Sequence, residues 1–89
     1  MRTKMEELLK EELRTLAILT RDRLNLTQKE MSKRLVMSES SYSDIETGES
    51  MCGTLTAVLL LSEQRNPEAY LRELRVKFQK QYEKDMQPV

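Results

Sequence analysis

Apolar residues recur every three or four positions along the N-terminal part of the chain. This spacing is typical of one buried face of an α-helix, and it predicts a helix over about residues 3–23. The predicted buried face consists of Met5, Leu8, Leu9, Leu13, Leu16, Ala17 and Leu19. The charged residues assigned to the solvated side are Glu6, Glu7, Lys10, Glu11, Glu12 and Arg14.

A leucine-rich stretch in the second half of the chain predicts another helix, over about residues 54–64, after a loop at 49–53. Leu59, Leu60 and Leu61 are consecutive, so on a helix their side chains point in three directions. A single core cannot take all three unless the helix is nearly surrounded. We therefore expect this helix to have a second buried surface.

The last helix is predicted over about residues 67–84. Asn66 is a favourable cap and Pro67 suits the first helical position. Its apolar stripe consists of Tyr70, Leu71, Leu74, Phe78 and Tyr82.

Residues 27–48 contain two helix starts, eleven residues apart. Thr27 and Glu30 have the spacing of a capping box, and Ser38 is a second cap. Gly48 can adopt the left-handed conformation that ends a helix. The segment therefore predicts two short helices, over about 28–35 and 39–47, joined by a tight turn: a helix-turn-helix.

These residues resemble the helix-turn-helix domain of phage Cro and repressor regulators, the XRE-like family. The pattern of that family is met without a gap at Thr27, Gln28, Leu35, Ser38, Ser43, Ile45, Glu46 and Gly48. Three positions depart from it: Ser32 replaces a small alanine, Val36 replaces the turn glycine, and Asp44 stands where a basic or neutral residue is common. The resemblance implies an all-α fold, a compact five-helix bundle like the lambda-repressor domain.

Composition adds limits to this interpretation. The chain of 89 residues is expected to form one domain over residues 1–89. No apolar run is long enough to cross a membrane, and the single cysteine, Cys52, fits a reducing cytoplasm. With no histidine and no glycine-rich phosphate loop, we expect no metal, no cofactor and no catalytic activity.

The resemblance also implies a set of DNA contacts. Gln28 would lie against a phosphate and brace the reading helix, and Lys29 and Lys33 would add phosphate contacts. The base-reading face would consist of Glu39, Ser40, Ser43, Asp44 and Thr47. Ser38, Ser41 and Glu46 are assigned to structure, as cap, packing residue and member of an intramolecular pair.

The charge distribution leaves two functions open. Positive and negative residues balance over the whole chain. Residues 27–36 carry three basic and one acidic side chain, a net of +2, whereas residues 37–53 carry four acids and no base, a net of −4. One hypothesis is a sequence-specific DNA-binding transcriptional regulator of bacterial or phage type. The alternative is a protein-interaction module on the same fold, such as an antitoxin, antirepressor or anti-activator, that uses the acidic face.

Under the DNA-binding hypothesis we expect a homodimer on a palindromic duplex, because one such domain makes few contacts and two-fold symmetry doubles them. The residues assigned to the dimer interface are Leu60, Tyr70, Leu74, Phe78 and Tyr82. The same stripe on the last helix is also compatible with the last layer of a five-helix core in a single chain.

Overall fold

The computed structural model describes residues 2–86 and contains five α-helices. They are α1 (Arg2–Leu24), α2 (Gln28–Arg34), α3 (Glu39–Thr47), α4 (Thr54–Ser62) and α5 (Pro67–Met86). No β-strand occurs in this part of the chain. The all-α, five-helix prediction is therefore confirmed, and each predicted helix boundary lies within two residues of the observed one.

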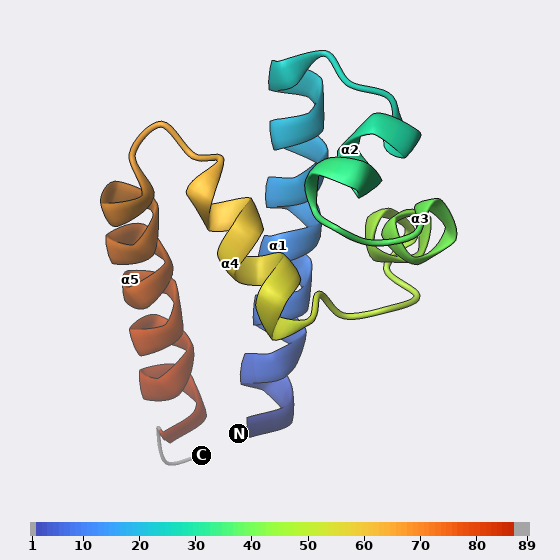
Figure 1. Cartoon of the computed structure of the whole chain (residues 1–89). Helices are drawn as coiled ribbons and strands as arrows, with labels where there is room; N and C mark the ends of the chain where they lie inside the picture. The colour runs from blue at the N-terminus through green and yellow to red at the C-terminus, as the bar shows by residue number, and fades with distance from the viewer. Residues whose placement is uncertain (1, 87–89) are drawn as a thin grey trace.

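Helix α1 forms the centre of the molecule, as Figure 1 shows. Helices α2 and α3 pack against each other and α3 packs on α1, while α4 and α5 contact α1 from the other side. Side chains from α1 to α4 and from the loop before α4 form the core. Its buried apolar members are Leu13, Leu16, Ala17, Met31, Leu35, Tyr42, Ile45, Cys52 and Leu60.

Of the predicted buried face of α1, Leu13, Leu16 and Ala17 are buried, and Met5, Leu8 and Leu9 are half-buried. The prediction is wrong at one position. Leu19 is 60% exposed, whereas Thr20 is buried. Successive helical residues are 100° apart, so Thr20 falls in line with Leu16 and Ala17 while Leu19 points away. The Thr20 hydroxyl accepts a hydrogen bond from Gln64 Nε2 at 3.0 Å, which satisfies a polar group that the apolar pattern did not indicate.

The predicted helix caps are present. Thr27 Oγ1 accepts from the backbone N–H of Glu30 (3.1 Å), and the Glu30 carboxylate accepts from the N–H of Thr27 (3.0 Å). Ser38 Oγ accepts from the N–H of Ser41 (3.2 Å). Gly48 ends α3 with φ +84°, the left-handed conformation that glycine adopts at low cost.

Val36 marks the turn between α2 and α3, where the resembling family has glycine. Its φ is +56°, a conformation that is strained for a β-branched residue. The turn is made nonetheless, with the N–H of Val36 donating to Lys33 C=O and that of Met37 donating to Ser32 C=O. Valine in place of glycine at position 36 therefore keeps the geometry of the turn, but its backbone is strained.

Replacing Val36 with glycine should raise the free energy of unfolding by about 1 kcal/mol. The left-handed conformation costs a non-glycine residue about 1–3 kcal/mol, and the larger freedom of glycine in the unfolded chain offsets only part of that gain. Little packing is lost, since Val36 is 72% exposed. Urea denaturation measures the change. Val36→Ala, which keeps the Cβ atom, is the control and should gain much less; a glycine variant less stable than the parent would contradict the strain.

Candidate nucleic-acid interface

Helix α3 is anchored by two inward side chains. Tyr42 and Ile45 are both buried, and the Tyr42 hydroxyl donates to Ala17 C=O at 3.4 Å. Burial raises the pKa of the Tyr42 hydroxyl, so it stays protonated and remains a donor. These two buried side chains and the hydrogen bond to α1 therefore determine the orientation of α3.

A buried carboxylate joins α3 to α1 and α2. Glu46 accepts a bidentate pair from Arg21, with Nε to Oε2 at 2.6 Å and Nη2 to Oε1 at 3.1 Å. Gln28 Nε2 donates to the same Oε1 at 3.0 Å, and Arg14 Nε donates to Glu46 C=O at 2.8 Å. These contacts hold the C-terminal end of α3 against both neighbouring helices.

The pKa of Glu46 reflects this network. Burial alone would raise the pKa, but hydrogen bonds from Arg21 and Gln28 favour the charged form and bring the pKa below its ordinary value. The same pairing raises the pKa of Arg21. The pair is therefore fully ionised at neutral pH, and the role assigned to Glu46 from the sequence, an intramolecular pair, is confirmed.

Gln28 occupies the first position of α2 and is half-buried. Its amide nitrogen is held by Glu46, so the side chain braces α2 against α3. This contact is the bracing part of the role implied by the family resemblance; the phosphate contact remains a proposal.

Lys29 and Lys33 are exposed and lie four residues apart on α2. Neither makes an ion pair with the part of the chain that the structure describes. Arg34, the third basic residue of this helix, is paired with Glu63 at 2.9 Å. Lys29 and Lys33 are therefore available to bind an external anion, whereas Arg34 is not.

The polar face of α3 points away from the core. Glu39, Ser40 and Thr47 are exposed, and Ser43 and Asp44 are half-buried. Carboxylates on such a face accept hydrogen bonds, as from the N4 amine of cytosine, while hydroxyls both donate and accept. The chemistry of this face therefore suits base edges that offer donors, and the acids disfavour close approach to phosphates.

Two arginines of this site were not indicated by the sequence. Arg14 was assigned to the solvated side of the first helix, and Arg21 was not singled out, yet both donate to Glu46 from 25 or more residues away in sequence. A cap can be predicted from residues that lie three positions apart. No local pattern of that kind signals an ion pair between residues 25 or more positions apart. The available signal in the sequence was the assignment of Glu46 to an intramolecular pair, which left its partner unidentified.

The residues assigned to a dimer interface do not share one environment. Leu60 is fully buried in the core of its own chain, so its assignment to an exposed interface is wrong. Its neighbours Leu59 and Leu61 are partly buried against the same core. Tyr70 is half-buried against the same core. Leu74 and Phe78 are half-buried, and Tyr82 is exposed. Leu74, Phe78 and Tyr82 line one open groove, and Tyr70 lines a separate one.

Two other classes of site are absent from the described residues. No helix among them is both long and apolar enough to span a bilayer. No group of three or more potential metal ligands comes together in that part of the chain either.

The paired helices α2 and α3, with an outward polar face on α3, define a DNA-binding helix-turn-helix regulator. Comparison with known families agrees: the family model described as helix-turn-helix matches residues 19–63, about half of the chain. The chain belongs to this helix-turn-helix family, of the XRE-like kind, a DNA-binding regulatory family that is not typically enzymatic. No curated protein and no solved structure matches the chain.

Proposed function

We propose that the protein is a sequence-specific transcriptional regulator that binds a palindromic DNA duplex as a homodimer in the cytoplasm. Helix α3 enters the major groove, and its exposed polar face reads base edges. The observation that supports this most directly is the position of that face: it points outward while Tyr42 and Ile45 hold the helix from behind.

The residues that contact DNA in this proposal divide by chemistry. Gln28, Lys29 and Lys33 on α2 contact phosphates, which determine affinity and register. Base contacts come from Glu39, Ser40, Ser43, Asp44 and Thr47 on α3. Because two of these five side chains are carboxylates, the face favours a DNA site that presents cytosine N4 or adenine N6 amines to α3.

Selection of bound duplexes from a random pool, followed by affinity measurements against salt, tests the proposal. About six to ten phosphate contacts in the dimer give a log–log slope of roughly −5 to −9. Replacing both Lys29 and Lys33 with alanine should make the slope shallower by about 1 per lost contact. Lys80→Ala, an exposed lysine of α5, is the matched control and should leave it unchanged. An affinity that does not respond to salt would count decisively against DNA binding.

A second candidate function is favoured by the acidity of the same face. Glu39, Asp44 and Glu49 lie on or next to α3, and a face with this charge also suits docking to a basic protein. Charge reversal separates the two functions. If α3 contacts DNA, the double variant Asp44→Lys with Glu39→Arg should bind DNA of any sequence more tightly. If α3 contacts a basic protein, the same variant should no longer bind that protein.

A further inference from the structure

Helix α5 packs on α1 without burying a full face of its own. None of its residues is buried, and its main contacts are with α1. Ion pairs from Lys77 to Glu12 (2.7 Å) and from Lys4 to Asp85 (3.4 Å) join the two helices. An amphipathic helix usually gains its stability by burying its apolar stripe. The apolar stripe of α5 therefore remains accessible to another molecule.

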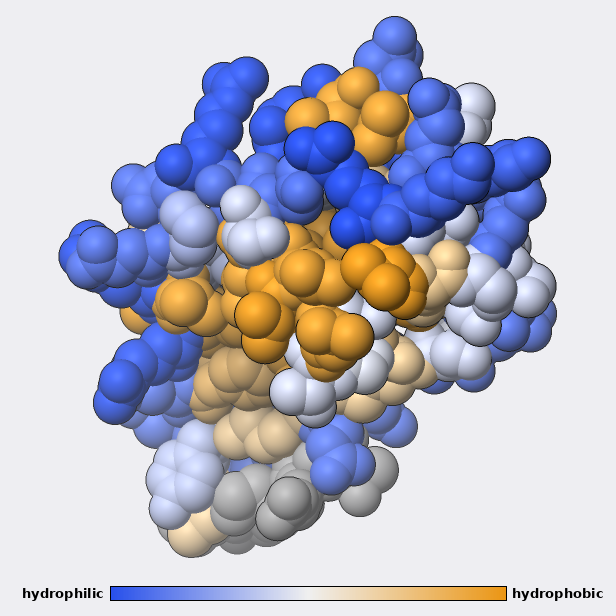
Figure 2. Space-filling model, viewed as in Figure 1, coloured by the Kyte–Doolittle hydropathy of each residue, from blue (hydrophilic) through white to orange (hydrophobic). Residues whose placement is uncertain are grey.

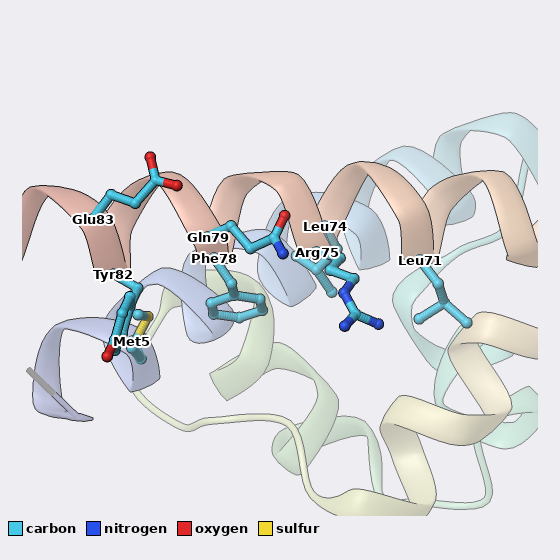
Figure 3. Close-up of a pocket in the computed structure, with 8 residues that line it drawn as sticks. All are labelled: Met5, Leu71, Leu74, Arg75, Phe78, Gln79, Tyr82 and Glu83. Carbon is cyan, nitrogen blue, oxygen red and sulfur yellow. The ribbon is translucent and has the colours of Figure 1, made fainter.

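That stripe lines an open groove of about 720 Å³, shown in Figure 3. The apolar side chains that line the groove are Leu71, Leu74, Phe78 and Tyr82 on α5 and Met5 on α1. Small-molecule sites in proteins are typically concave, about 300–1,000 Å³ in volume, and lined by apolar side chains with a few polar groups. The groove has the size and the lining of such a site.

One cation lines this groove and has no acidic partner in the described part of the chain. It is Arg75, and Figure 3 shows its guanidinium on the same side of α5 as Leu71 and Phe78. Glu83 also lines the groove, but its carboxylate points away from these side chains (Figure 3). The groove therefore combines an apolar lining with a positive charge that is available to a ligand.

We propose that the groove binds a free medium-chain carboxylate of the fatty-acid type. The carboxylate of this ligand accepts hydrogen bonds from the guanidinium of Arg75, whose paired N–H groups match a carboxylate in geometry. The hydrocarbon chain lies along Leu74 and Phe78 and ends at Tyr82 and Met5. Arg75 and Tyr82 are seven residues apart, about 10 Å along α5, which is close to the extended length of decanoate. The ligand needs neither DNA nor a second copy of the chain, so its site is separate from the face of α3 proposed to read DNA.

The dimensions of the groove favour a small molecule over a protein. Stable protein interfaces bury about 800 Å² per partner, more than a short stripe on one helix supplies. Another exposed apolar surface lies over the region of α4 (Figure 2), where Leu55 and Val58 are exposed, but neither residue lines the groove. An amphiphile with one negative charge therefore matches the groove in size, polarity and charge.

Two ligands of the same length test the role of charge. Decanoate and the uncharged decanol are titrated separately into the full chain without DNA, and the NMR shifts of the α5 amides report binding. Decanoate should bind with a dissociation constant on the order of 0.1–1 mM. Arg75→Glu should weaken decanoate binding about tenfold, because an attraction becomes a repulsion, and should leave decanol binding unchanged. Lys80→Glu, the same charge change at an exposed position of α5 outside the groove, is the control and should change neither affinity.

Two substitutions of nearly equal exposure test the path of the hydrocarbon chain. Tyr82 and Val76 are 49% and 47% exposed on the same helix, but only Tyr82 lines the groove. Tyr82→Ser should weaken decanoate binding about fivefold, because the end of the hydrocarbon chain loses its apolar contact. Hexanoate is too short to reach position 82 from Arg75, so its affinity should not change. Val76→Ser should alter neither affinity, and circular dichroism checks that both variants keep their helices.

Three results would overturn the proposal. The first is equal affinity of the parent chain and Arg75→Glu for decanoate, and the second is a Tyr82→Ser variant that binds decanoate as the parent does. The third is a groove that a second copy already covers: decanoate then leaves the amide shifts of α5 unchanged, while dilution of the protein alone moves them. All three are measured without DNA, so failure of this proposal and failure of the proposed DNA binding are distinguishable.

Discussion

Replacing Tyr42 with alanine should lower the free energy of unfolding by about 3–5 kcal/mol. Tyr42 is the largest fully buried side chain, and it connects α3 to α1 through both packing and a hydrogen bond. The cavity left by its ring would lie at the junction of these two helices. A domain of this size is typically stable by only about 5–15 kcal/mol, so the substitution should remove a large part of its stability. Urea denaturation followed by circular dichroism measures the loss.

Tyr42→Phe separates packing from hydrogen bonding at this site. It keeps the ring and removes only the hydroxyl that donates to Ala17 C=O, so its cost should be about 1 kcal/mol. A small effect of the alanine variant would mean that the anchor of α3 lies elsewhere. A phenylalanine variant as unstable as the alanine variant would place the stabilisation in the polar network around the hydroxyl rather than in the packed ring.

The helices of this chain could be predicted because their signals are local. The capping box of Thr27 and Glu30 and the cap at Ser38 each depend on residues three apart. Tyr42 and Ile45 lie three residues apart, so the rotation of 100° per residue places these two apolar side chains on one face of α3. Such features need no knowledge of the rest of the fold, and they located both helices of the helix-turn-helix.

The features that sequence reasoning missed depend on contacts between distant parts of the chain. Leucine at position 60 could face the core or a partner, and only the packing of α4 on α1 decides in favour of the core. Arg21 has the same side-chain chemistry as the exposed arginines of the chain. Its role follows from the place where Glu46, 25 residues later, meets it. Periodicity assigns residues to faces but does not identify what covers each face.

The acidity of α3 bears on how the proposed regulator discriminates between sites. Exposed carboxylates repel phosphates, so they weaken binding to every sequence that does not offer donors to them. Affinity for DNA sites of other sequence falls as a result. One copy of the chain offers only two lysines on α2, Lys29 and Lys33, to offset the repulsion between the acids and the phosphates. A dimer doubles the number of favourable contacts on a palindrome. In the proposed regulator, the acidity of α3 and the pairing of two copies on a palindrome therefore act together.

Glu46→Ala should destabilise the protein by about 3 kcal/mol, because it leaves the guanidinium of Arg21 largely buried without its counter-charge. Arg21 retains some exposure, which places the expected cost at the lower end of the usual range for a broken buried pair. The double variant Arg21→Met with Glu46→Leu removes both charges and should recover most of the loss. Urea denaturation of the parent, the single variants R21M and E46L and the double variant gives the coupling between the two sites. An alanine variant as stable as the parent would show that the pair contributes little.

The same carboxylate should make stability depend on acid pH. The pKa of Glu46 in the folded chain is below its ordinary value of 4.5, so the unfolded chain binds the proton more readily. Its contribution to stability is therefore complete above about pH 4.5 and is lost as the pH falls through the lower, folded pKa. Glu46→Gln removes this titration and should flatten the loss of stability below pH 4.5. Some dependence should persist, because the backbone hydrogen bond from Thr27 lowers the pKa of Glu30 in the same way. If the glutamine variant and the parent lose stability in parallel as acid is added, the network does not hold Glu46 in its charged form.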